Sequence, residues 1–323
     1  MRNPYFLGDI FVHGRNKIRW PEGKKFAFTV FDDTDLSTLE NVKEIYSFLM
    51  DHGFRTTKSV WAIQGAENAL FGGLTCEDRN YLKWLYALKD AGFEIGYHNA
   101  TFCSSLRDET IRGIERFKEL FGYYPKTMAN HSKNRENIYW GEYRVTGVNR
   151  LLYNLLSRNR YKGFFQGHIE NSKYFWGDIC KEKVKYVRNF VFSDINTLKA
   201  CPIMPYHDPV RPYVNYWFAS SEGADVAAFN KCIAEQAQDR LEQEGGACIM
   251  YTHFAKGFYQ KGEINPRFKF LIKRISKKDG WFVPVGTLLD YLLNLKGHYN
   301  ISDKERSYLE IKWLLHKIKV GRT

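Results

Sequence analysis

Short apolar segments that end in a polar turn and lead into a stretch of helical spacing recur along this 323-residue chain. The first is residues 25–31, KFAFTVF, which stops abruptly at Asp32 and Asp33 and is followed by helical spacing over residues 35–53. Alternation of strands and helices is typical of a parallel sheet, either open or closed into a barrel. The chain is therefore predicted to adopt an α/β fold.

The same pattern predicts the other elements of the sheet and its helices. Further strands are predicted at residues 58–63, 93–98, 126–130, 185–192, 247–252 and 281–285. Further helices are predicted at residues 78–92, 107–122, 224–244, 266–276 and 287–295, with a less regular helical stretch at 142–160. No repeat or low-complexity linker divides the chain. We therefore predict one domain over residues 1–300, with an insertion at about residues 140–220 and a basic C-terminal helix over 301–323.

The charge balance favours an anionic partner. The formal net charge is +12 and the pI is near 9.2, which suits nucleic acid, anionic lipid or a phosphorylated substrate. Residues 144–190 hold ten Lys and Arg against three acids, so this segment forms either a solvated basic face or a groove for an anionic ligand. No nucleic-acid-binding motif accompanies the charge, so specific nucleic-acid binding is not expected. The C-terminal helix could lie on an anionic membrane face or pack back on the domain.

The remaining composition points to the cytoplasm. The first 20 residues contain no continuous apolar segment and no small-residue cleavage site, so no secretory signal is expected. No window approaches the roughly 20 apolar residues of a membrane-spanning helix. Six scattered cysteines without a C-x-x-C pair are typical of free thiols in a reducing compartment.

Carboxylates and imidazoles stand where the predicted strands end. Asp32 and Asp33 follow the first strand, and His98, His131 and His253 follow three others. The carboxyl ends of parallel strands meet at one edge of the sheet, so these side chains are expected to lie close together. Histidines and an aspartate can hold a divalent metal with a position open for water, while a second aspartate acts as general base and another histidine as general acid.

Four segments resemble, in order and spacing, the polysaccharide deacetylase (NodB-homology) family, also called carbohydrate esterase family four. They are FDDTD at residues 31–35, EIGYHNAT at 94–101, CIMYTH at 248–253 and GWFVPVGTLLDYL at 280–292. The resemblance implies a distorted (β/α) barrel and removal of an acetyl group from an N-acetylated sugar by a metal-dependent hydrolase. Carried over by position, Asp32 would be the general base, Asp33 and His98 metal ligands, and His253 the acid that protonates the leaving amine.

The chain departs from the family pattern at one metal ligand. The second histidine of the family motif falls at Phe102, which cannot bind a metal. We predict that His131 supplies this ligand from the next strand, giving Asp33, His98 and His131, because a metal requires ligand atoms at about 2.0–2.2 Å and no fixed sequence offset. Thr101 and Asn130 offer only neutral oxygen ligands and are poorer candidates.

Two functions remain open. The first is a metal-dependent hydrolase, with zinc as the expected ion, that removes an N-acetyl group from an amino sugar of a saccharide precursor of the capsule or O-antigen type. A nucleotide- or lipid-diphosphate-linked sugar would match the positive charge, because phosphates pair with Arg and Lys. The alternative is a catalytically inactive deacetylase-like protein that binds glycan, which Phe102 favours.

Overall fold

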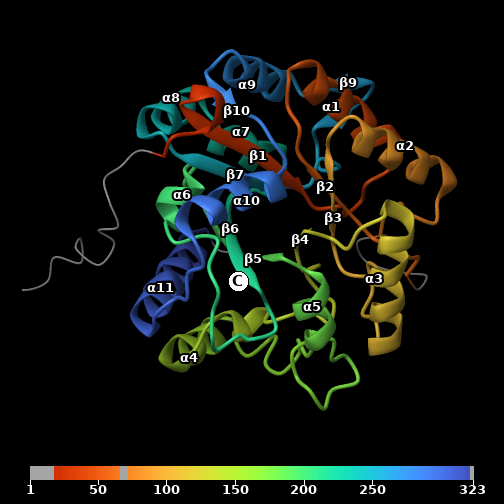
Figure 1. Cartoon of the computed structure of the whole chain (residues 1–323), viewed down its shortest axis with the longest axis vertical. Helices are drawn as coiled ribbons and strands as arrows, with labels where there is room; N and C mark the ends of the chain where they lie inside the picture. The colour runs from red at the N-terminus through yellow and green to blue at the C-terminus, as the bar shows by residue number, and fades with distance from the viewer. Residues whose placement is uncertain (1–17, 66–71, 321–323) are drawn as a thin grey trace, which may run out of the picture.

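Seven parallel strands close into a barrel in the computed structural model, which describes residues 18–65 and 72–320 (Figure 1). Each strand pairs with the next along the chain, and β7 pairs with β1 to close the ring. The strands are β1 (Phe26–Asp32), β2 (Thr57–Val60), β3 (Glu94–Tyr97), β4 (Thr127–Met128), β5 (Tyr186–Phe192), β6 (Tyr216–Gly223) and β7 (Ala247–Thr252). The predicted (β/α) barrel is thus confirmed as the fold class.

The first strand is the seam of this barrel. Along one edge it pairs with β7 from Ala27 to Asp32. Its other edge is shared, because the short strand β10 (Gly280–Trp281) pairs with its start and β2 pairs with its end. All seven residues of β1 are buried, as a strand covered on both faces requires. The end of β1 is therefore fixed next to the ends of β2 and β7.

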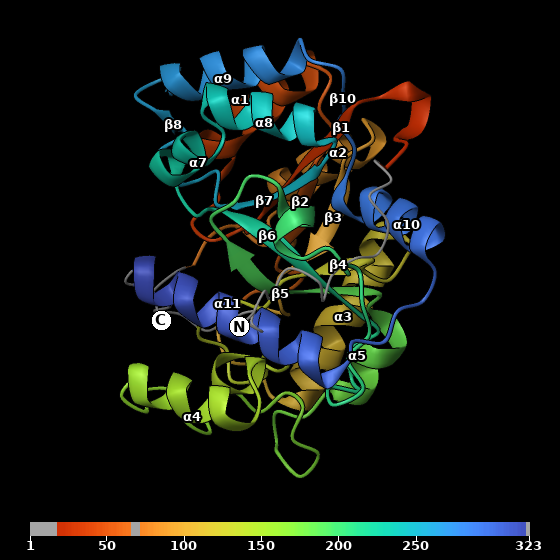
Figure 2. The ribbon, with the colours of Figure 1, turned by 90° about the vertical axis from the view of Figure 1, so that its left-hand side faces the viewer.

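Helices cover the outside of the barrel (Figures 1 and 2). Their apolar residues recur at helical spacing and face the strands, as Val42, Ile45 and Leu49 do in α1. The long helices are α1 (Leu39–Asp51), α2 (Arg79–Asp90), α3 (Arg107–Phe121), α4 (Gly147–Leu156), α8 (Glu235–Glu244), α9 (Pro266–Ser276), α10 (Val285–Lys296) and α11 (Asp303–Val320). Shorter elements are η1 (Pro21–Gly23), η2 (Gly141–Arg144), α5 (Gly177–Lys183), α6 (Thr197–Ala200), α7 (Val226–Cys232) and the hairpin β8 (Tyr259–Gln260) and β9 (Glu263–Ile264).

The middle of the chain contributes more to the barrel than the sequence pattern predicts. Strands β5 and β6 both lie within or at the end of the predicted insertion, and β6 is not predicted at all. The predicted helix at 224–244 is two helices, α7 and α8. Two parts of this segment lie outside the barrel strands: residues 141–183, which carry α4 and α5, and the connection 193–215 between β5 and β6, which carries α6.

The C-terminal helix α11 packs back on the domain through buried Leu309, Trp313 and Leu314. Within the described ranges, no helix has the length and hydropathy needed to span a bilayer. Residues 1–17, on which the expectation of no secretory signal rests, lie outside the described residues.

The close approach of α3 to the loop after β3 gives a test of the fold. A Cβ added at Gly113 would meet the Cβ of Ala100 and lie 2.9 Å from its Cα. Gly113→Ala, which in an open helix would stabilise, should therefore lower the free energy of unfolding by about 1–3 kcal/mol in urea titration. Adding Ala100→Gly should restore part of the loss, and a Gly113→Ala protein as stable as wild type would contradict this packing.

Candidate active site

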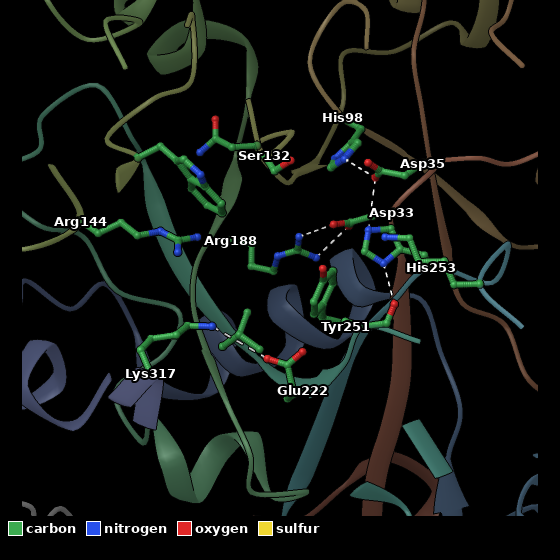
Figure 3. Close-up of a pocket in the computed structure, with 15 residues that line it drawn as sticks. Asp33, Asp35, His98, Ser132, Arg144, Arg188, Glu222, Tyr251, His253 and Lys317 are labelled. Carbon is green, nitrogen blue, oxygen red and sulfur yellow. Dashed lines mark hydrogen bonds and ion pairs between the residues drawn. The ribbon is translucent and has the colours of Figure 1, made fainter. Parts of the chain in front are cut away.

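A pocket opens at the carboxyl ends of the barrel strands, where β/α barrels gather their functional side chains (Figure 3). Its volume is about 210 Å³, below the roughly 300–1,000 Å³ of pockets that enclose drug-sized ligands, so it has room for part of a saccharide. The charged and ring side chains at its centre are Asp33, Asp35, His98, Arg188, Tyr251 and His253.

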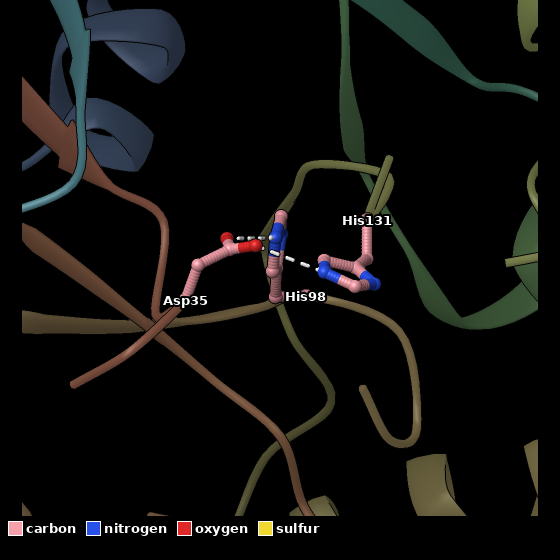
Figure 4. Close-up of side chains that lie close together, drawn as sticks. All are labelled: Asp35, His98 and His131. Carbon is pink, nitrogen blue, oxygen red and sulfur yellow. Dashed lines mark hydrogen bonds and ion pairs between the residues drawn. The ribbon is translucent and has the colours of Figure 1, made fainter. Parts of the chain in front are cut away.

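Three histidines converge on the carboxylate of Asp35. The Nε2 atom of His131 lies 2.9 Å from Asp35 Oδ1, and Nε2 of His98 lies 3.1 Å from Oδ2 (Figure 4). Nε2 of His253 lies 3.3 Å from the same Oδ2. All four side chains are buried. Three loops far apart in the sequence therefore direct one ring nitrogen each at a single carboxylate.

The other ring nitrogen of each histidine is held by an oxygen acceptor. His98 Nδ1 lies 2.9 Å from the carbonyl of Ala129, and His253 Nδ1 lies 2.7 Å from the carbonyl of Ala224. A carbonyl can only accept, so both Nδ1 atoms carry a proton. If Nδ1 of His131 is protonated as well, Nε2 is the unprotonated nitrogen in all three neutral rings.

His131 is held by an amide whose orientation is fixed. The amide nitrogen of Asn134 donates to the Thr101 carbonyl and to Glu136 Oε1, which turns its oxygen toward His131. Nδ1 of His131 donates to that oxygen at 3.0 Å. Outer-sphere contacts of this kind select the tautomer and orientation of metal-binding histidines.

This arrangement calls for a positive charge between the rings and Asp35. A neutral ring protonated at Nδ1 has a lone pair on Nε2, and a lone pair does not attract a carboxylate oxygen. Burial would raise the pKa of Asp35, but hydrogen bonding to His131, His253 and His98 holds that pKa well below its ordinary value. Burial would likewise lower the pKa of His131, but Asp35 raises it. Either protons added to the Nε2 atoms or a bound cation must therefore supply the positive charge between the rings and Asp35.

A divalent cation suits these donors. Asp35, His98 and His131 each offer one ligand atom, and these atoms lie within 4.8 Å of one another. Asp33, Asp35 and His253 form a second such group. Ligand atoms at about 2.1 Å from a tetrahedral ion lie about 3.4 Å apart, close to the separations seen here. The residues present therefore fit a metal that takes imidazole and carboxylate ligands.

Asp33, predicted as a metal ligand, is instead engaged by Arg188 on β5. The two guanidinium nitrogens of Arg188 donate to the two carboxylate oxygens of Asp33 at 2.9 and 2.5 Å, and both side chains are buried. Burial would raise the pKa of Asp33, but the Arg188 charge holds it below its ordinary value. The structure thus brings Asp35, and not Asp33, between His98 and His131.

A bulge in β5 brings Arg188 to the pocket. The register of β5 against β6 shifts between Arg188 and Val191, and both residues line the pocket although an odd separation would place them on opposite faces of a regular strand. Arg188 was not predicted from the sequence. The predicted strand 185–192 also contains the polar residues Lys185 and Asn189, and nothing local linked Arg188 to Asp33.

Asp32, predicted as the general base, does not line the pocket. Its side chain is fully buried and accepts hydrogen bonds from Lys58 Nζ at 2.8 Å and Tyr46 OH at 2.9 Å. Its other oxygen accepts from the backbone N–H of Phe254 at 2.8 Å, which fixes the residue after His253. Because successive strand residues point to opposite faces, Asp33 faces the pocket when Asp32 does not. Asp32 therefore positions the end of β7.

Phe102, which stands at the family's second histidine, packs behind the site. Its ring meets Trp61 edge-on with centroids 5.2 Å apart. Trp61 in turn lies 6.1 Å from the His98 ring and 5.5 Å from the His131 ring. Phe102 thus packs against Trp61, and the Trp61 ring in turn contacts the rings of His98 and His131.

The buried pair of Lys58 and Asp32 can be tested by substitution. Burial would lower the pKa of Lys58, but the Asp32 carboxylate raises it, so the lysine is charged. Lys58→Met should lower the free energy of unfolding by about 3–5 kcal/mol, since it leaves the buried carboxylate without its cation. The double variant Lys58→Met with Asp32→Asn should recover more than half of this loss. Equal stability of wild type and Lys58→Met in chemical denaturation would refute a charged pair.

No protein-family model matches this chain, and no curated protein sequence matches it. Among solved structures, the "putative polysaccharide deacetylase" of Mycobacterium smegmatis is similar over 88% of this chain and 96% of its own, with a TM-score of 0.51 and 13% identity. A probable polysaccharide deacetylase from Pseudomonas aeruginosa PAO1 aligns over 90% of this chain and 99% of its own, with a TM-score of 0.46 and 12% identity. The Puue allantoinase aligns over 92% and 99%, with a TM-score of 0.48 and 13% identity.

The first of these similarities spans nearly all of both chains and agrees with the closed parallel barrel described above. At 13% identity it establishes the fold alone. The chain has the polysaccharide deacetylase (NodB-homology) fold.

Proposed function

We propose that this protein is a metal-dependent hydrolase that removes an N-acetyl group from an amino sugar of a saccharide precursor. The observation that carries the proposal is the convergence of three imidazole Nε2 atoms on Asp35, each with its Nδ1 proton held by an oxygen. Buried histidines arranged in this way are suited to share a cation. The fold and the place of the cluster at the mouth of the barrel support the same reaction class.

The proposed metal ligands are Asp35, His98 and His131, with Asp35 taking the place predicted for Asp33. Zinc is the proposed ion, since it takes imidazole nitrogen and carboxylate oxygen and leaves a position open in catalytic sites. When bound there, the ion would polarise the amide carbonyl and lower the pKa of water toward about 7. His253 adjoins this set and is assigned a different role.

Asp33 is the proposed general base. Its pKa is held below the ordinary value, so the carboxylate is ionised at neutral pH, and its position in the pocket would let it accept a proton from water. Arg188 donates a hydrogen bond to each carboxylate oxygen of Asp33 and so fixes the orientation of the Asp33 side chain in the pocket. Asp32, the base predicted from the sequence, is hydrogen-bonded to Lys58 and Tyr46 and does not line the pocket, so it is not proposed as the base.

His253 is the proposed general acid. Departure of the amine requires a proton, because an amide anion is a poor leaving group. The Nδ1 proton of His253 is held by the Ala224 carbonyl, which leaves Nε2 as the atom that faces the pocket and can deliver a proton. The hydrogen bond from Phe254 N to Asp32 keeps the ring at this position.

The test combines metal analysis with acetate release from N-acetylated amino sugars. Wild-type protein should bind about one equivalent of divalent metal, and chelation should abolish acetate release. Asp35→Ala, His98→Ala and His131→Ala should each lose the metal. Asp33→Asn should keep the metal and reduce acetate release by at least about 100-fold, as loss of a general base does.

The matched control is His298→Ala, which removes an exposed histidine outside the pocket and should leave metal content and turnover unchanged. Thermal unfolding of each variant separates loss of the site from loss of the fold. Wild-type protein that cannot be loaded with any divalent metal, yet still binds glycan, would favour the inactive glycan-binding alternative.

A further inference from the structure

The pocket contains a buried guanidinium without an acidic partner. Arg144, the last residue of η2, is 8% exposed and lines the pocket. Its Nε atom has no hydrogen-bond partner, and no carboxylate pairs with the side chain, among the residues that the structure describes. The guanidinium carbon stacks 3.1 Å from the ring centroid of Trp140 and lies 5.3 Å from that of Trp313. Two aromatic rings therefore hold a cation whose polar edge is left unpaired.

Other buried arginines in the described ranges are neutralised. Arg188 pairs with Asp33, Arg306 with Asp208, and Arg211 with Asp208 and Glu310. A buried charge without a partner lowers the stability of the fold. The presence of such a charge at Arg144 therefore indicates that a ligand pairs with it. Burial lowers the pKa of Arg144 to about 9, which leaves the side chain charged at neutral pH. The missing partner is therefore an anion.

The surroundings of Arg144 strengthen the demand for negative charge. The pocket is also lined by Lys256 and Lys317, and Figure 3 shows Arg144 directed into it on the side away from Asp35. Three carboxylates line the pocket: Asp33 pairs with Arg188, Asp35 with the three histidines, and Glu222 lies 4.0 Å from Lys317. No protein carboxylate in the described pocket is thus left for Arg144.

We propose that Arg144 is the anion-binding group of the substrate site, so that the saccharide carries a phosphate or carboxylate besides its N-acetyl group. The guanidinium fork matches either anion with two parallel hydrogen bonds, and the Trp140 stack fixes the plane of the fork. The identity of the saccharide rests on the proposed function, whereas anion binding at Arg144 does not require turnover.

Binding measurements test this without relying on catalysis. Calorimetric titration with N-acetylglucosamine 1-phosphate, N-acetylmuramic acid, neutral N-acetylglucosamine and inorganic phosphate compares the anions directly. Wild-type protein should bind one anionic sugar at least tenfold more tightly than the neutral sugar, and the preferred anion identifies phosphate or carboxylate. Arg144→Met should abolish this preference with neutral-sugar affinity unchanged, and Arg144→Lys should retain part of it because it keeps the charge but not the fork.

The control Arg112→Met removes an exposed arginine of α3 and should keep the preference. Arg144→Met should unfold at the same temperature as wild type or higher, because an unpaired buried charge is replaced by an apolar chain. An Arg144→Met protein that unfolds earlier and keeps the anion preference would mean that Arg144 is structural. Absence of binding by both anionic sugars and by phosphate to wild type would also overturn the proposal, whatever the outcome for acetate release.

A separate observation concerns the outer faces of α4 and α11. Five apolar residues of α4 recur at spacings of three and four and face solvent, with Val148, Leu151 and Leu155 79%, 70% and 75% exposed beside the less exposed Leu152 and Leu156. The apolar face of this amphipathic helix is thus directed away from the core and toward solvent. Such a face normally marks a contact with another apolar surface.

Helix α11 presents a second stripe beside the first. Ile311, Leu315 and Ile318 are 45%, 61% and 52% exposed. The two helices are in contact, with the buried rings of Tyr153 and Trp313 stacked between them, and Figure 2 shows them side by side. The exposed apolar residues of α4 and α11 are called the α4–α11 face below.

Charge identifies the partner of the α4–α11 face. Four basic residues that no described acid pairs with are exposed beside the stripes: Arg158, Arg160 and Lys162 after α4, and Lys319 near the end of α11. A second copy of the chain would bring like charges together, whereas an anionic lipid surface accepts both the apolar stripes and their basic rim.

We infer that the α4–α11 face docks on an anionic bilayer surface, with α4 and α11 lying in the headgroup region. Arg144 lies three residues before Gly147, the first residue of α4, and Lys317 belongs to α11, so the pocket mouth adjoins the α4–α11 face. Docking would therefore bring the pocket close to the headgroups.

Vesicle flotation tests the docking. Wild-type protein should float with vesicles of equal parts phosphatidylcholine and phosphatidylglycerol at least tenfold more than with phosphatidylcholine alone. Leu151→Ser with Leu155→Ser should abolish flotation. The control Phe270→Ser with Leu295→Ser, which removes apolar residues of α9 and α10 that are 51% and 52% exposed, should not. If wild type does not float and is a dimer that the first variant converts to a monomer, the face is an interface between copies and the inference fails.

Discussion

The Asp35 carboxylate is the point that organises the functional end of the barrel. Each of its histidine neighbours is tied at Nδ1: His98 and His131 by Ala129 and Asn134 in the loop after β4, and His253 by Ala224 after β6. The position of one ring therefore depends on loops that follow several strands, and none of the rings can turn without losing a buried hydrogen bond. Holding the rings in this orientation lowers stability only if the buried Nε2 lone pairs have no partner. The geometry that fixes the rings therefore favours a cation bound between them.

The barrel seam explains why these groups meet. Pairing of β1 with β7 runs as far as Asp32 and Thr252, so the residues that follow both strands leave the sheet together. The Asp32 side chain then joins Lys58 of β2 to the backbone of Phe254 after β7. A buried ion pair at this seam contributes little net stability against an apolar replacement, but it sets the relative position of the strand ends. Asp33 and Asp35 reach the pocket because Asp32 is held on the other side.

The sequence supports the architecture more firmly than the site. Largely apolar runs predict β1 and β7, and alternation over residues 185–192 predicts β5. Strand β6 ends in small polar residues such as Ser220 and Ser221 and does not stand out. Histidines at strand ends could be predicted as a group. Which aspartate of residues 32–35 faces the pocket depends on the residue at which β1 ends, and a shift of one residue reverses the face. The pairing of Asp33 with Arg188 spans 155 positions and leaves no local signal.

Two features of the chain are unfavourable in the isolated molecule. The buried charge of Arg144 has no counter-ion from the described protein, and the stripes of α4 and α11 expose leucine and isoleucine to water. Selection for stability alone would remove both, because an apolar residue at 144 and polar residues on the two helices are the more favourable choices. Both features lie beside the same pocket. The Arg144 charge would be satisfied by an anion inside the pocket, and the apolar stripes by burial in a lipid surface whose anionic headgroups pair with the basic residues around them. An anionic saccharide presented at a bilayer would relieve the two costs together, which explains why they occur as neighbours.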